Sequence, residues 1–117
     1  MSKQSNIHIQ VDLNDQQVPE KISWQATDSP DSGTNTAKAM MLSFWDSAEK
    51  AALKIDLWTQ SMMVDEMAEY FYQTFMIMAD TYGNATQYTQ DAESIRSFAK
   101  EFMKKFQERQ KQENKIS

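Results

Sequence analysis

The chain has 117 residues, a net charge of −5, one histidine and no cysteine, a length that predicts a single domain over residues 1–117. The acidic balance disfavours nucleic acid and anionic membrane surfaces as partners, because proteins that bind them gather Lys and Arg on one face. One histidine without cysteine excludes a typical zinc site, a thiolate nucleophile and a disulfide.

Two strands are predicted at the start of the chain. Apolar residues occupy every second position of residues 7–13, which is typical of a strand with one wet face. Turn-forming residues follow at 14–17, and the alternation resumes over residues 18–25. Pro19 has no amide to donate, so the second strand should begin there or lie at a sheet edge. The pair predicts an antiparallel hairpin, and the small polar residues 26–36 predict a flexible loop after it.

A second hairpin is predicted after this loop. In each of its two strands the apolar residues fall on every second position: Met40, Leu42 and Phe44 in the first, and Leu53, Ile55 and Leu57 in the second. If both sets face the core, Phe44 pairs with Leu53 and Leu42 pairs with Ile55. This register leaves residues 47–50 as a four-residue loop, which is a common hairpin length.

The period changes to that of a helix after the second hairpin. The first helical stripe consists of Met63, Met67, Phe71, Phe75, Met78 and Tyr82. Gly83-Asn84 is a plausible stop for this helix. The apolar face of the second helix consists of Ala92, Ile95, Phe98, Ala99, Phe102 and Phe106. Residues 108–117 have almost nothing to bury and are expected to fray.

The order of these elements predicts an α+β fold. We expect a four-stranded antiparallel sheet, built from two hairpins and followed by two C-terminal helices packed on one face. No run of about 18 apolar residues is present, so no membrane insertion is expected. The first 15 residues lack the apolar stretch of a secretory signal, and a cytoplasmic location is expected.

No residues assemble into a catalytic motif. His8 lies on the predicted wet face of the first strand, where an ordinary surface role is expected. Gly33 and Gly83 are too isolated to build a phosphate-binding loop. Asp65 and Glu66 stand early in a predicted helix, where carboxylates interact favourably with the helix dipole. We therefore expect neither enzymatic activity nor a cofactor.

The other face of the second hairpin is a candidate interaction face. In the predicted register Met41, Trp45 and Trp58 point away from the core, among polar neighbours. Methionine and aromatic residues are enriched at protein interfaces. The partner would be a second copy of the chain or another protein. The alternatives are that the long loop covers these residues, or that the register is wrong.

Several segments resemble the GldC family of gliding-motility-associated proteins of Bacteroidota. The similarity runs over residues 18–106 and is densest in FWDSAEK, KIDLWT and MMVDEM, with the aromatic pair Tyr70-Phe71 after them. The resemblance implies a soluble cytoplasmic protein linked to gliding motility, with partners in the gliding or envelope machinery. It supplies no catalytic motif and no functional residues.

Three hypotheses of function follow. The leading one is a non-enzymatic interaction or accessory protein. The second is a protein that binds single-stranded nucleic acid by stacking bases on exposed aromatic residues, although the acidic charge opposes it. The third is a carboxylate-based enzyme or a carrier of a small ligand, which needs a pocket with perturbed Asp or Glu residues.

Overall fold

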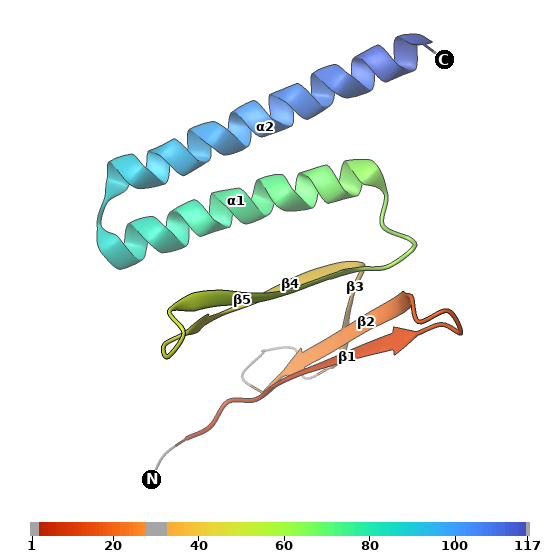
Figure 1. Ribbon diagram of the computed structural model, residues 1–117, viewed down its shortest axis with the longest axis vertical. Helices are drawn as coiled ribbons and strands as arrows, with labels where there is room; N and C mark the ends of the chain where they lie inside the picture. The colour runs from red at the N-terminus through yellow and green to blue at the C-terminus, as the bar shows by residue number, and fades with distance from the viewer. Residues whose placement is uncertain (1–2, 28–32, 117) are drawn as a thin grey trace. The chain divides into compact units, whose positions relative to one another are not determined.

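The computed structural model describes residues 3–27 and 33–116 (Figure 1). The chain comprises two compact units, Met1–Met62 and Met63–Ser117. All strands of the described residues belong to the first unit, and the two helices belong to the second. Two such units can belong to one cooperative domain, so the single-domain expectation stays a prediction.

The first hairpin forms as predicted. Strand β1 (Ile7–Leu13) pairs antiparallel with β2 (Pro19–Ala26). The Oδ1 atom of Asn14 accepts the backbone N–H groups of Gln16 and Val18, at 2.8 and 3.0 Å, which fixes the turn. The sequence predicted that the second strand either begins at Pro19 or lies at a sheet edge, because proline has no N–H to donate. Strand β2 does begin at Pro19.

A short strand that the sequence did not predict completes this sheet. Strand β3 (Asn35–Ala37) pairs with the other side of β2, giving the order β1-β2-β3. The central strand consequently carries the best-buried large side chain of the described residues, Ile22, which is 1% exposed. The stretch expected as a flexible loop, residues 26–36, includes the start of β3. Its residues 28–32 lie outside the described part of the chain, and its flexibility stays a prediction.

The second hairpin has the predicted register. Strands β4 (Ala39–Asp46) and β5 (Ala51–Trp58) are antiparallel. Phe44 is opposite Leu53, and Leu42 is opposite Ile55. Residues 47–50 form the connecting turn. Asp46 Oδ1 holds this turn by accepting backbone N–H groups of residues 48 and 49 at 2.9 and 3.1 Å.

The expectation of one four-stranded sheet is wrong. The described residues form five strands in two antiparallel sheets, one of three strands and one of two. Strand β3 occupies the free edge of β2, so that edge is not available to β4. The chain then bends at Lys38 before β4 begins, and β4 pairs with β5 alone among the described strands. The expected packing of the helices on one sheet face stays a prediction.

The second unit is a pair of antiparallel helices that lie side by side, α1 (Val64–Thr86) and α2 (Thr89–Ile116) (Figure 1). Gly83 lies inside α1, so the predicted stop at this glycine is wrong. The helix ends three residues later, where Gln87 has a φ of 66° and donates its N–H to the Gly83 carbonyl at 2.8 Å. Helix α2 extends to Ile116, and the fraying expected for residues 108–117 stays a prediction.

Small residues let the two helices approach closely. A Cβ atom at Gly83 would lie 3.2 Å from the Cβ of Ala92, so the glycine serves packing rather than termination. Ala79, Ala92 and Ala99 are buried as well. Phe75 of α1 meets two phenylalanines of α2, Phe98 and Phe102, edge to face, with ring centroids 5.3 and 5.6 Å apart. The helix pair therefore has its own apolar core.

Candidate interaction surface

The structure places Met41, Trp45 and Trp58 on one face of the β4–β5 hairpin, which we call the tryptophan face. Met41 is opposite Asp56, Trp45 is opposite Ala52, and Trp58 is opposite Ala39. Residues directly opposite in a ladder share a face, and these three pairs have the same parity. The register predicted from the sequence therefore correctly puts the three candidate residues on one side of the sheet.

Both tryptophans of this face are open to solvent. Trp45 is 67% exposed and Trp58 is 59% exposed, whereas Met41 is half-buried. The pairs that contain the tryptophans are separated by six residues of β5, which corresponds to about 20 Å along the strand. The two indoles thus lie at opposite ends of the same face and do not touch each other.

Apart from Met41, the strip between the tryptophans is polar. Lys54 and Asp56 lie on β5 with their side chains on the tryptophan face, and the ammonium group of Lys54 forms an ion pair with the Asp56 carboxylate. Ser43 on β4 is opposite Lys54. The face therefore consists of two aromatic ends joined by a charged centre whose formal charges cancel.

The opposite face of the hairpin, which the sequence assigned to the core, is also open. Phe44, Leu53 and Ile55 each expose more than half of their surface, while Leu42 and Leu57 are half-buried. The sequence reasoning missed this second apolar surface. The run AMMLSFW in β4 contains little strict alternation, and such continuous apolar runs are typical of strands that need cover on both faces.

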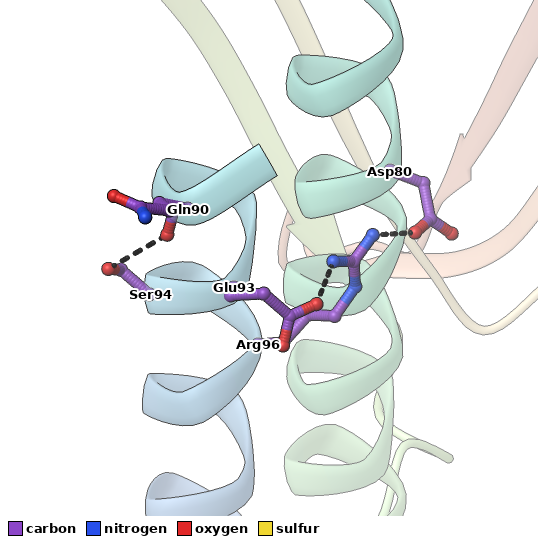
Figure 2. Close-up of polar contacts among 5 residues, drawn as sticks. All are labelled: Asp80, Gln90, Glu93, Ser94 and Arg96. Carbon is purple, nitrogen blue, oxygen red and sulfur yellow. Dashed lines mark hydrogen bonds and ion pairs between the residues drawn. The ribbon is translucent and has the colours of Figure 1, made fainter. Parts of the chain in front are cut away.

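Polar contacts at the α1–α2 surface were not predicted from the sequence. Figure 2 shows Arg96 of α2 between Asp80 of α1 and Glu93 of its own helix. The Arg96 Nη2 to Asp80 Oδ1 distance is 2.7 Å. These carboxylates, Asp80 foremost, raise the pKa of the Arg96 guanidinium, so the residue keeps its charge. One turn away on the same helix, the Ser94 hydroxyl group donates to the backbone carbonyl of Gln90 at 3.2 Å.

A second polar contact joins the helices near their connection. The hydroxyl group of Tyr82 on α1 donates to Oδ2 of Asp91 on α2, at 3.0 Å. This hydrogen bond raises the pKa of the Tyr82 phenol, because ionisation would place a phenolate beside a carboxylate. Both groups lie at the surface, so the contact joins the helices without forming a pocket.

The hollows in the surface bring together few reactive groups. One hollow lies at the start of α2 and is lined by Thr89, Gln90, Glu93, Ser94 and Ser97. Another lies beside β1 and β2 and is lined by Asn6, His8, Gln25, Ala26 and Thr27. His8 is exposed there, as the strand pattern predicted. Over residues 3–27 and 33–116, no group of three or more His, Asp or Glu side chains is arranged to hold a metal ion.

No helix in the part of the chain that the structure describes could cross a membrane. Neither α1 nor α2 combines the length and the apolar character that a span requires. Helix α2 in particular carries charged residues along most of its length.

Comparison with known proteins identifies a family. No curated protein and no solved structure matches the chain significantly. Residues 19–108 match the family described as gliding motility-associated protein GldC-like. The match covers β2 to most of α2, including both strands of the tryptophan face. It agrees with the resemblance over residues 18–106, and the chain therefore belongs to the GldC-like family of gliding motility-associated proteins.

Proposed function

We propose that this chain is a non-enzymatic accessory protein that acts in the cytoplasm and binds a protein of the gliding or envelope machinery through the tryptophan face. The observation that carries the proposal is the exposure of Trp45 and Trp58 on one side of the same hairpin. Membership of a gliding motility-associated family supports the biological context.

The chemistry of the face fits a protein partner. Tryptophan is the residue type most enriched among binding hot spots, where it fills a pocket and is shielded from water by surrounding contacts. Two tryptophans about 20 Å apart suit a partner with two separate apolar pockets. The Lys54–Asp56 pair between them would set orientation rather than supply most of the affinity.

The same face is poorly suited to single-stranded nucleic acid. Base stacking on aromatic residues requires a positive groove that follows the phosphates. Lys54 is the only basic residue within strands β4 and β5, and Asp56 pairs with it. A titration with oligonucleotide at low salt, followed by tryptophan fluorescence, should therefore give no salt-sensitive response. A clear response would favour the nucleic-acid alternative.

A crosslinked pull-down from native cells tests the proposal. The tagged wild-type chain is compared with the variant Trp45→Ala/Trp58→Ala, which removes both aromatic ends of the face. Because both side chains are mostly exposed, the variant should keep its circular dichroism spectrum and melting temperature. We expect the wild type to recover gliding or envelope components and the double variant to lose them.

Trp24→Ala is the matched control. Trp24 also lies on a strand, but in the other sheet and about one third exposed. It should recover the same partners as the wild type. Equal recovery by the wild type and the double variant would show that the tryptophan face is not the binding surface. Equal loss in Trp24→Ala and the double variant would point to a general effect on folding.

A further inference from the structure

The outer edge of β5 has free backbone groups at defined positions. Strand β5 pairs only with β4 among the described residues. The Thr59 N–H donates to the Lys38 carbonyl at 2.8 Å. These two residues directly flank the Ala39–Trp58 pair, so they occupy a hydrogen-bonded position of the ladder. Hydrogen-bonded pairs alternate along an antiparallel ladder, and the odd-numbered residues of β5 therefore face β4. The outward N–H and C=O groups belong to Ala52, Lys54, Asp56 and Trp58.

We propose that this edge binds a second copy of the chain. The two β5 strands would pair antiparallel about a twofold axis that passes through Ile55, giving a continuous four-stranded sheet with the order β4-β5-β5-β4. This inference concerns the strand edge rather than the tryptophan face, and it does not depend on the proposed function.

Charge complementarity selects the register of this pairing. With Ile55 opposite Ile55 of the second copy, each Lys54 lies opposite an Asp56, so two pairs of opposite charges form. A shift of the axis by one residue places Lys54 opposite Lys54, or Asp56 opposite Asp56. Like charges directly opposite destabilise a sheet. The sequence KID at residues 54–56 is therefore self-complementary in one register only.

The apolar side chains agree with the same register. On the face opposite the tryptophans, Leu53 lies opposite Leu57 of the second copy on both sides of the central Ile55 pair. Leu53 is 53% exposed and Ile55 is 51% exposed in the single chain, so both have surface to bury. On the tryptophan face each Trp58 lies opposite the small Ala52, which leaves room for the indole.

The corresponding edge of β4 lacks these features. Its outward groups belong to Ala39, Met41, Ser43 and Trp45, and none of these residues carries a charge that would fix a register. A two-stranded sheet alone is marginally stable in water, and an unprotected edge invites pairing with another chain. The matched charges of β5 make pairing with a copy of the same strand specific.

A cysteine placed at the axis tests the register directly, because the chain contains no cysteine. The two Ile55 residues would form a non-hydrogen-bonded pair with Cα atoms about 4.5 Å apart, which is within the range of a disulfide. Ile55→Cys should therefore give a covalent dimer under mild oxidation. Leu53→Cys is the matched control on the same face and with the same exposure, but its two copies would be about 13 Å apart and should not crosslink.

Proline substitutions distinguish the outer edge of β5 from the outer edge of β4. Lys54 and Ser43 are opposite each other, and their N–H groups point to opposite outer edges of the hairpin. Proline at either position spares the hydrogen bonds between β4 and β5 but removes one outward donor. Light scattering across a dilution series should show dimers for the wild type and Ser43→Pro, and monomers for Lys54→Pro. Circular dichroism verifies that both variants stay folded.

Charge reversal tests the proposed pairs of Lys54 and Asp56 between the two copies. Lys54→Glu and Asp56→Lys should each weaken dimerisation about tenfold, because each creates two like-charge pairs across the axis. The double variant Lys54→Glu/Asp56→Lys restores opposite charges and should recover dimerisation. A monomeric wild type, equal crosslinking at positions 53 and 55, or a dimer that survives Lys54→Pro would each overturn the inference.

Discussion

The helix pair α1–α2 and the strand pair β4–β5 are both antiparallel hairpins, but only the helix pair buries residues completely. Ala79 and Ala99 have no exposed surface, whereas neither β4 nor β5 contains a fully buried residue. Each helix satisfies its own backbone hydrogen bonds, so two helices need only meet along one stripe. A two-stranded sheet has two faces and two edges, and one partner strand satisfies a single edge. The difference explains why the candidate binding surfaces lie on the strands.

Overpacking the contact between α1 and α2 should give the largest loss of stability. Ala99→Leu adds three carbons at a position with no exposed surface, where the neighbouring helix must move or the side chain must adopt a strained rotamer. Such substitutions typically cost about 1–3 kcal/mol. We expect a corresponding fall in the free energy of unfolding, measured with urea and followed by the helical signal of circular dichroism.

Ala85→Leu is the control for this substitution. Ala85 lies on α1 and is exposed, and leucine has nearly the same helix propensity as alanine. The control should therefore unfold at close to the wild-type urea concentration. If Ala99→Leu and Ala85→Leu behave alike, the helix contact is not the rigid core inferred from Gly83 and Ala92.

A large-to-small change on the strand pair should cost less. Phe44→Thr removes a ring that already exposes more than half of its surface and keeps a residue that favours strands. The expected cost is about 0.2–1 kcal/mol, the range of one cross-strand pair, here with Leu53. Urea unfolding in the Lys54→Pro background, which we expect to be monomeric, measures this cost without a contribution from dimerisation. A loss as large as that of Ala99→Leu would mean that this face is covered in solution.

Most of the strands could be predicted from the sequence, because local patterns determined them. The alternation of apolar and polar residues predicted β1. The positions of the apolar residues in β4 and β5, together with the length of the loop between them, predicted the register of this hairpin. Strand β3 could not be predicted, since its three residues carry no apolar pattern and pair through their backbone. Gly83 was misread because its role is a tertiary contact with Ala92. The tryptophan face followed from the register, whereas the exposure of its opposite face depends on tertiary packing that no local pattern encodes.

Removing the ion pairs of Arg96, one to the other helix and one within α2, should have a smaller effect than either packing change. Arg96→Met keeps much of the side-chain volume but loses the contacts with Asp80 and Glu93. Ion pairs at the surface contribute little, and salt screens them. We expect a small fall in melting temperature at low ionic strength that disappears in about 1 M salt. A fall that is independent of salt would indicate that the aliphatic part of Arg96, rather than its charge, supports the helix pair.

The smallest expected effect concerns pH and the hydrogen bond from Tyr82 to Asp91. A phenol whose pKa is raised in the folded state stabilises the fold below its ordinary pKa of about 10, and this contribution is lost as the pH rises through the higher folded value. Tyr82→Phe should therefore melt slightly below the wild type at neutral pH, and the gap should narrow above about pH 10. In an Asp91→Asn background the same substitution should give a gap that changes less with pH, because Asp91 is the main cause of the raised pKa. An equally narrowing gap in both backgrounds would show that Asp91 does not couple the two helices through this tyrosine, and that the apolar contact and the Arg96–Asp80 ion pair join them without it.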